Sequence, residues 1–165
     1  MTYTNSNNMG KPDSAAPRPG EGKRGTAGRI GYLLMQAASV FRLAMARALS
    51  DLDVTPPQFS VLTIIDGYPG ISSADIARLS LLTPQTLSVI VSNLLRAGTI
   101  ARSPHPVHGR IQRLALTAEG ATLLATCRLR VHALEHDLEA ALSSDQSALL
   151  RGWLVDVART QTRDK

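Results

Sequence analysis

The chain has 165 residues, of which 44% are hydrophobic and 4% aromatic, which is enough for one domain whose core is built from aliphatic side chains. The single cysteine, Cys127, excludes a disulfide framework and a multi-cysteine zinc site, and no apolar run approaches the ~18 residues that a membrane span requires. The N-terminal residues lack the apolar core of a signal peptide, so a cytoplasmic protein is expected.

The net charge of +5 is unevenly distributed along the chain. Residues 1–54 carry seven Lys or Arg and four Asp or Glu, residues 55–117 carry five and two, and residues 118–165 carry six and seven. The three segments therefore have charges of +3, +3 and −1. A basic surface favours a polyanionic partner, nucleic acid or anionic lipid, and a soluble surface without such a partner is the alternative.

The first 54 residues divide into a tail and a helix. Residues 1–25 are rich in Gly, Pro, Ser and Asn and poor in apolar residues, which is typical of a flexible segment. From Thr26 onward, apolar residues recur at spacings of three and four, which predicts a first helix over 28–49 within the segment 26–54.

Side-chain caps mark the starts of the later helices. Four segments combine a capping residue with a favourable first turn, namely TPPQ (55–58), SSAD (72–75), TPQT (83–86) and SSDQ (143–146), and Thr117 is a weaker fifth cap. With the apolar periodicity they predict helices over 56–66, 73–80, 84–97, 118–141 and 144–161, and strands near 100–103 and 111–116. The expected fold class is mainly α with a small β-hairpin.

The helix predicted over 84–97 has two different faces. Its apolar stripe, which faces a core, consists of Leu87, Ile90, Val91, Leu94 and Leu95. The remaining face is short, polar and almost uncharged, and comprises Gln85, Thr86, Ser88, Val89, Ser92, Asn93 and Arg96. An ordinary solvated face carries Glu and Lys pairs, whereas these groups can donate and accept at base edges without obstructing close approach. Val89 is a candidate contact for a thymine methyl group, or an incidental exposed valine.

The neighbours of this helix complete a DNA-binding pattern. The segment SADIARLS (73–80) precedes it across a tight turn, which is typical of a helix-turn-helix whose second helix reads DNA. The two strands that follow form a hairpin, and a hairpin directly after a reading helix is typical of a wing. In the second strand Leu114 and Leu116 are expected to face inward and Arg113 outward.

The loop SPHPVHGR (103–110) is the expected tip of this wing. Pro104 and Pro106 stiffen its flank, and Gly109 permits a turn or a close approach to a backbone. The groups that can donate to phosphates or in a minor groove are Arg102, His105, His108 and Arg110.

Residues 118–165 carry two apolar sets that a single chain would not easily cover. The first steps by three and four along the helix over 118–141, as in a coiled coil, through Leu124, Cys127, Val131, Leu134, Leu138 and Ala141. The second lines the last helix and consists of Leu149, Leu150, Trp153, Leu154 and Val157. They predict a dimer interface at Leu124, Val131, Leu134, Leu138 and Trp153, with intramolecular packing as the alternative.

In the order of its elements the chain resembles the MarR family of bacterial regulators over about residues 28–161. The resemblance rests on LTPQTLSVIVSNLLRAGTIAR (82–102), on HPVHGRIQRLALTAEG (105–120) and on the long flanking helices. The family commonly has Asp-Arg-Arg before the second wing strand, where this chain has His108, Gly109 and Arg110, so only the last arginine matches.

The resemblance implies a homodimer that binds a palindromic operator through a winged helix-turn-helix domain at 55–117. Residues 26–54 and 118–165 would form the dimerisation region. A small effector would bind between the two regions, and its candidate contacts are Met35, Ser39, Arg42, Phe59 and Leu62. Arg42 suits a carboxylate, and Met35 and Phe59 suit an aromatic ring, but all five can equally be ordinary core or surface residues.

Two further features indicate different chemistry. HALEH (132–136) matches the H-x-x-E-H motif of zinc peptidases, with His132 and His136 one turn apart and Glu135 as the base. A polar helix face is the alternative, since a short pattern in a Leu- and Ala-rich helix arises by chance. Cys127 is a candidate redox sensor, although its position on the apolar seam favours an inert thiol.

The sequence therefore predicts a sequence-specific regulator of transcription that binds duplex DNA, acts as a repressor and is released by a small aromatic or carboxylate effector. It predicts no enzyme activity, no cofactor and no metal. A zinc-dependent hydrolase built on HALEH and a winged helix used only for protein contacts are the alternatives.

Overall fold

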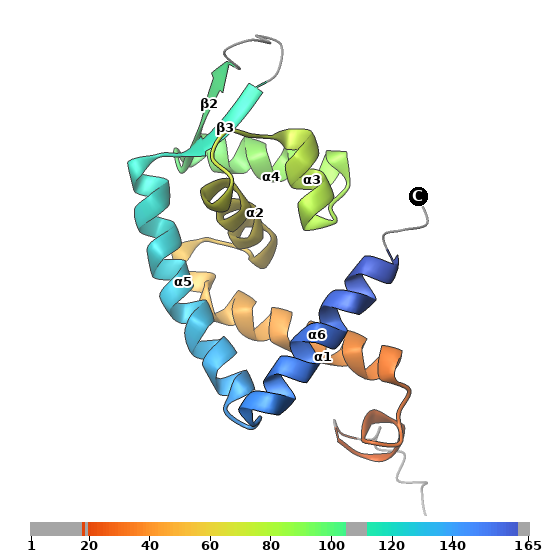
Figure 1. Ribbon diagram of the computed structural model, residues 1–165. Coiled ribbons are helices and arrows are strands. Elements are labelled where there is room, and N and C mark those ends of the chain that lie inside the picture. The colour runs from red at the N-terminus through yellow and green to blue at the C-terminus, as the bar shows by residue number, and fades with distance from the viewer. Residues whose placement is uncertain (1–17, 19, 105–111, 162–165) are drawn as a thin grey trace, which may run out of the picture. The chain divides into compact units, whose positions relative to one another are not determined.

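A computed structural model describes residue 18 and residues 20–104 and 112–161 (Figure 1). The chain divides into two compact units, residues 1–41 and residues 42–165. The described residues are mainly helical and contain one small antiparallel sheet, which confirms the predicted fold class.

The first unit contains a short 3₁₀ turn, η1 (Gly22–Arg24), and the larger part of helix α1 (Ile30–Ala48). Gly20 and Gly22 have positive φ angles of 90° and 51°, which fold the backbone back so that the Gly20 N–H donates to the Arg24 carbonyl. The Arg24 guanidinium then donates to Gln36 Oε1 over 2.9 Å. The turn lies within the predicted tail, because a three-residue element leaves no periodic pattern in a sequence.

Helices α2 (Pro56–Gly67), α3 (Ser73–Ser80) and α4 (Pro84–Arg96) begin where the caps predict. Each helix is preceded by a hydroxyl, on Thr55, Ser72 or Thr83, that accepts from the backbone N–H three residues later. The cap of α2 is a complete capping box, since Gln58 Oε1 also accepts from the Thr55 backbone N–H over 2.8 Å. Each such cap satisfies a donor that the helix leaves free and contributes about 1 kcal/mol.

The sheet has three antiparallel strands in the order β1-β3-β2. Strands β2 (Ile100–Pro104) and β3 (Gln112–Leu116) form the predicted hairpin, with Ile100 opposite Leu116 and Arg102 opposite Leu114. The third strand, β1 (Ile71–Ser72), was not predicted, because two residues are too few to show alternation.

The inward and outward positions of β3 are only partly as predicted. Leu114 is fully buried and Leu116 packs against the core. Arg113, expected to face outward, is half-buried over Gly70, whose positive φ of 80° and missing side chain leave room for the arginine stem. The pairing of Ser72 in β1 with Arg113 explains the difference, because β1 brings the preceding turn alongside β3.

The larger of the two hydrophobic cores among the described residues lies between α2, the helix-turn-helix of α3 and α4, the sheet and the start of α5 (Ala118–Glu139). Its buried residues are Val61, Leu62, Ile65, Ile76, Ala77, Leu87, Ile90, Val91, Leu94, Ile100, Leu114 and Leu124. Helix α4 contributes four of them, which confirms the predicted apolar stripe and fixes which face of α4 points away from the core.

The second core joins the segment that follows α1 to the middle of α5 and consists of Leu49, Val54, Cys127 and Val131. Leu124 and Val131 are each only 1% exposed within the single chain. This corrects their predicted place at a dimer interface, because their side chains are already covered intramolecularly. Leu134 is half-buried, and Leu138 is 62% exposed.

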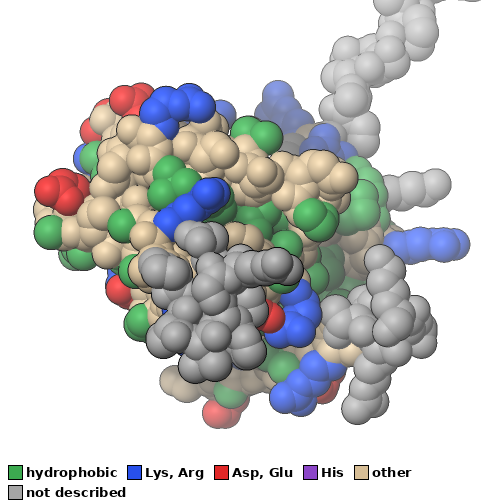
Figure 2. Space-filling view, turned by 90° about the horizontal axis from the view of Figure 1, so that it is seen from above, with side chains coloured by type: hydrophobic (Ala, Val, Ile, Leu, Met, Phe, Trp, Pro, Cys, Tyr) green, Lys and Arg blue, Asp and Glu red, His purple; other side chains and the backbone are tan. Residues whose placement is uncertain are grey.

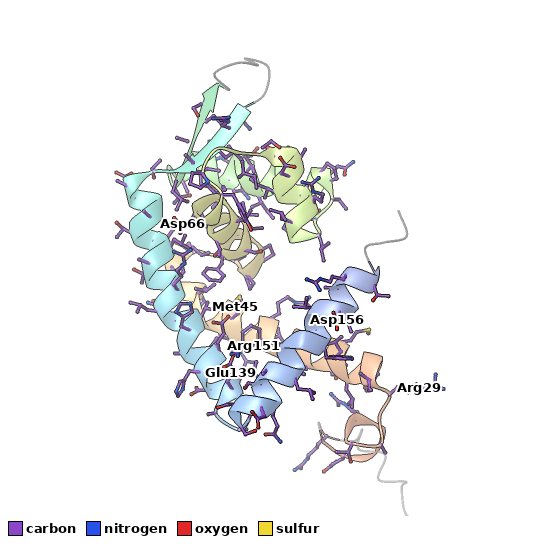
Figure 3. The ribbon with its side chains drawn as sticks, viewed as in Figure 1. Arg29, Met45, Asp66, Glu139, Arg151 and Asp156 are labelled. Carbon is purple, nitrogen blue, oxygen red and sulfur yellow. The ribbon has the colours of Figure 1, made fainter. Side chains whose placement is uncertain are left out.

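Helix α6 (Ser144–Gln161) follows α5 after a short turn, and Arg151 on α6 forms an ion pair with Glu139 on α5 at 2.6 Å (Figure 3). Its apolar side chains Leu149, Leu150, Trp153 and Leu154 are all exposed.

Among the described residues, none of the helices combines the length and the hydrophobicity that a membrane span needs, although α5 has 22 residues.

Candidate nucleic-acid interface

The outward face of α4 is as uncharged as the sequence predicts. Gln85, Ser88, Val89 and Ser92 are exposed, and Val89 has 62% of its surface exposed although it is aliphatic. Arg96, in the last turn, is also exposed and is the one charged residue among the thirteen of this helix. The face therefore offers short donors, acceptors and one apolar group.

Two of the predicted contacts on α4 are less available than their positions suggest. The Thr86 hydroxyl lies 2.9 Å from the Thr83 hydroxyl, and its backbone N–H donates to the same Thr83 oxygen, so Thr86 belongs to the helix cap. Asn93 is half-buried at the edge of the face. Apart from Arg96, the exposed groups of this face that take no part in the helix cap are thus Gln85, Ser88, Val89 and Ser92.

The turn between α3 and α4 is tight because Leu81 adopts a left-handed conformation with φ of 55°. The backbone N–H groups of Leu81 and Leu82 both donate to the Ala77 carbonyl, which closes the end of α3. Glycine is the usual residue at such a position. The leucine side chain is 80% exposed, so it does not compensate by packing.

A hollow of about 370 Å³ lies between α3, α4 and β2. Arg102 from β2 and Ser88 from α4 supply polar groups to it, while Ala74, Ala77 and Val91 are among its apolar lining residues. The hollow brings the arginine of strand β2 next to the outward face of α4. Arg102 is exposed, as a contact with a phosphate group would require.

The tip of the wing falls outside the described residues. The predicted contacts His105, His108 and Arg110, together with Pro106 and Gly109, lie there. Figure 2 views the molecule from the side of the wing; Lys and Arg side chains appear there as separate groups among hydrophobic and uncharged polar ones.

A junction that the sequence did not predict connects α4, the wing and α5. The Thr117 hydroxyl accepts from the Gly120 N–H over 3.0 Å and donates to the Gly98 carbonyl over 2.7 Å. The Thr117 N–H donates to the Thr99 carbonyl, and Gly120 lies so close to that carbonyl that a Cβ atom would overlap it. A glycine in the first turn of a long helix is the signal that could have identified this contact.

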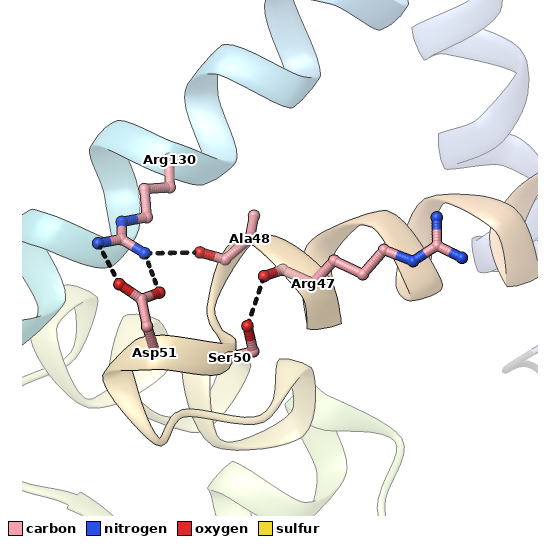
Figure 4. A network of polar contacts seen from close by, with 5 residues as sticks. All are labelled: Arg47, Ala48, Ser50, Asp51 and Arg130. Carbon is pink, nitrogen blue, oxygen red and sulfur yellow. Dashed lines mark hydrogen bonds and ion pairs between the residues drawn. The ribbon is translucent and has the colours of Figure 1, made fainter.

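A network of polar contacts fixes α5 to the segment after α1 (Figure 4). The Arg130 guanidinium binds both carboxylate oxygens of Asp51, with Nη2 3.0 Å from Oδ2, and Nη1 also donates to the Ala48 carbonyl over 3.0 Å. These hydrogen bonds hold the pKa of Asp51 below its usual value. Arg128, two residues earlier, pairs with Asp66 on α2 at 2.8 Å. The two arginines therefore bind α5 to a residue that precedes α2 and to a residue in the last turn of α2.

The residues proposed for an effector differ in exposure. Met35 is 66% exposed and Arg42 is exposed, Ser39 is half-buried, and Phe59 is half-buried against both cores. Leu62 is fully buried in the larger core, so its side chain would reach an effector only after a rearrangement.

The residues of the predicted zinc motif HALEH and the candidate redox cysteine lie in different surroundings. His132, Glu135 and His136 are exposed on α5, and among the described residues no three metal-ligating side chains lie close enough together to hold an ion. Cys127 is fully buried in the second core, and burial raises the pKa of its thiol, which keeps it in the less reactive protonated form.

Comparison with known proteins identifies the family. A sequence model of the MarR family matches residues 52–111. The HTH-type transcriptional repressor Rv2887 of Mycobacterium tuberculosis strain H37Rv is 35% identical over 117 residues, which cover 71% of this chain and 84% of that protein.

Solved structures agree with this relationship. The crystal structure of Rv2887 with p-aminosalicylic acid superposes with a TM-score of 0.64 and 30% identity, covering 79% of this chain and 99% of that one. The structure of the transcriptional repressor CouR bound to a 23-mer DNA duplex superposes with a TM-score of 0.73 and 27% sequence identity, covering 79% of this chain and 92% of CouR. The structure of the C80S variant of Escherichia coli MarR with operator DNA superposes with a TM-score of 0.71 and 26% sequence identity, covering 78% of this chain and 92% of that one. The chain has a helix-turn-helix followed by a hairpin, and it is 35% identical to a repressor that it covers over 84% of that protein's length. It therefore belongs to the MarR family of transcriptional regulators.

Proposed function

We propose that this protein is a transcriptional repressor that binds duplex DNA at a palindromic operator as a homodimer and is released by a small effector. The observation that carries the proposal is the outward face of α4, where Gln85, Ser88, Val89 and Ser92 are exposed and uncharged. Such groups can approach base edges in a major groove, and a soluble helix without a partner has no need to avoid charge.

The proposed contacts divide into reading and holding groups. Gln85, Ser88, Val89 and Ser92 would face bases, and Arg96 and Arg102 would bind phosphates on either side. Thr86, Asn93, His108 and Arg110 remain predicted contacts from the sequence. The DNA complexes of CouR and of the MarR variant support this arrangement, because both proteins share the fold at more than 25% identity.

Two variants separate reading from holding. We expect Gln85→Ala to change base preference at one position, by about 1–3 kcal/mol of discrimination. Arg102→Ala should weaken binding to all duplexes alike, and the slope of log affinity against log salt concentration should become smaller by about one. Arg159→Ala, an exposed arginine on α6, makes the same change of net charge outside the winged domain and should leave both quantities unchanged. Unaltered selectivity in Gln85→Ala would mean that another face of α4 reads the DNA.

The dimer is proposed from apolar groups that the described chain leaves uncovered. Trp153 and Leu138 from the predicted interface are exposed, as are Leu149, Leu150 and Leu154 on α6. Sedimentation equilibrium should give twice the chain mass of 17.7 kDa. Trp153→Arg should shift the equilibrium toward the monomer, because a charge would have to be buried without a partner. A wild-type monomer at micromolar concentration would contradict the proposal.

The effector is proposed to be a small aromatic carboxylate. Its proposed contacts are Met35, Ser39, Arg42 and Phe59, together with Leu62 once a rearrangement uncovers that side chain. Crystal structures of Rv2887 with salicylic acid and with p-aminosalicylic acid support this class of ligand. Salicylate should lower the affinity for operator DNA, and Arg42→Ala should weaken that response because a carboxylate would lose its guanidinium partner. Salicylate binding without any change in DNA affinity would contradict a role in release.

We also propose that HALEH is a polar face of α5 and that the protein is not an enzyme. His132, Glu135 and His136 are exposed on a helix, and the described residues supply no further ligand beside them. Stoichiometric zinc binding with peptide hydrolysis that Glu135→Gln abolishes would overturn this assignment.

A further inference from the structure

The reading face of α4 differs from one suited to guanine. Guanine is most often read by the two donors of an arginine or by a lysine at its O6 and N7 acceptors. Arg96, the charged residue of α4, lies seven residues after Val89, which is about 10 Å further along the helix axis. Because the N-terminal part of a reading helix contacts base edges, Arg96 is placed for the DNA backbone rather than for the bases.

The groups in the first two turns of α4 are suited to adenine and thymine instead. Gln85 is exposed in the first turn, and a glutamine amide can donate to N7 and accept from N6 of adenine. Val89, one turn later, has 62% of its surface exposed and presents methyl groups to solvent. The one base with a methyl group in the major groove is thymine.

The residues around Val89 also favour contact with a thymine methyl group. Its neighbours one turn away on the outward face are Gln85 and Ser92, whose side chains are uncharged. The nearby Thr86 hydroxyl bonds with the Thr83 hydroxyl in the helix cap and is likewise uncharged. A thymine methyl can therefore cover Val89 without desolvating a charged group.

We propose that each half-site of the operator contains an adenine read by Gln85 and a thymine whose 5-methyl group packs on Val89. Four residues of helix separate the two side chains by about 6 Å, and base pairs are about 3.4 Å apart, so these two A·T pairs lie within about two steps of each other. The inference rests on the proposed function and adds the base pairs that the reading face selects.

The test begins with selection of preferred duplexes from a randomised pool by the full chain. Each thymine of the selected half-site is then replaced, one position at a time and symmetrically, by deoxyuridine, which lacks only the 5-methyl group. Fluorescence anisotropy compares the affinities. At one position deoxyuridine should weaken wild-type binding by about fourfold per half-site, which is the effect of leaving one methyl group in water. Val89→Ser should bind the thymine and deoxyuridine duplexes equally.

Leu129→Ala is the matched control, since it truncates a leucine that is 75% exposed on α5. It should keep the wild-type ratio between thymine and deoxyuridine. If deoxyuridine has no effect at any position while the selected duplex is still preferred over a scrambled one, the thymine contact is wrong and the proposed function stands. If no duplex is preferred over its scrambled counterpart, the proposed function fails and this inference fails with it.

Discussion

Gly120 has a structural role that no other residue type can fill. Its Cα lies in the first turn of α5 beside the Thr99 carbonyl, and a Cβ atom there would overlap the carbonyl oxygen and carbon. We expect Gly120→Ala to lower the free energy of unfolding by about 3 kcal/mol, because backbone rather than a flexible side chain must move. Thermal denaturation measures the effect.

Gly152→Ala provides the comparison for this substitution. Gly152 lies inside α6, and a methyl group added there would meet nothing within 4 Å, so alanine should stabilise the helix by about 0.5–1 kcal/mol. Equal effects of the two substitutions would show that the contact between α5 and Thr99 is not tight.

Asp51 makes stability depend on pH through its bonds with Arg130. The pKa of Asp51 is lowered in the folded protein, so its contribution is complete above the pKa of the unfolded chain and is lost as the pH falls through the folded value. Asp51→Asn should therefore melt below the wild type at pH 7, and the gap should close below about pH 4. In an Arg130→Met background, Asp51→Asn should make no difference that depends on pH; a gap that persists there would assign the effect to another group.

At the scale of single residues, the sequence predicted which face of α4 points outward better than it predicted side-chain partners. The exposed and buried sides of α4 follow from 3.6-residue periodicity alone, so Gln85 and Val89 were placed on the outward side. The engagement of Thr86 with Thr83 and the burial of Arg113 over Gly70 depend on rotamers and on a turn that brings distant residues together. Periodicity contains neither kind of information.

At the scale of the elements, the residue that caps α5 also links this helix to the segment that follows α4. Thr117 accepts from the first turn of α5 and also donates to the Gly98 carbonyl at the end of α4, nineteen residues earlier. The Thr55 hydroxyl, by contrast, bonds with Gln58 within its own turn. We expect Thr55→Ala to cost about 1 kcal/mol and Thr117→Ala about 2 kcal/mol, since the second also leaves a carbonyl without its partner. Urea denaturation compares them, and equal losses would mean that the bond to Gly98 contributes nothing.

The helices were predictable because their starts carry local chemical signals. Thr55, Ser72, Thr83 and Thr117 cap helices that begin at the expected residues. Strand β1 was not predictable, because two residues show no alternation and their pairing with β3 is set by a distant part of the chain, as in the pairing of Ile71 with Leu114. Elements held by local bonds are visible in a sequence, whereas those held by distant pairing are not.

For the whole molecule, periodicity predicted an apolar seam on α5 but not what covers it. Leu124, Cys127 and Val131 recur at the spacing of a coiled coil, yet they pack into two cores of the same chain. A helix that packs within its own chain and one that packs on a partner have the same period, so the pattern could not distinguish them. Of the residues predicted at the dimer interface, Leu138 on α5 and Trp153 on α6 are exposed and remain open to a partner.

The most direct test of sequence-specific regulation is whether the intact protein prefers a specific duplex. Fluorescence anisotropy with DNA from upstream of its own gene, against a shuffled duplex of the same composition and at two salt concentrations, measures this. We predict a preference of about 10³-fold or more and an affinity that falls steeply with salt. Equal, weak binding to both duplexes at both salt concentrations, also for duplexes selected from a random pool, would contradict a sequence-specific regulator and favour a winged helix that contacts proteins.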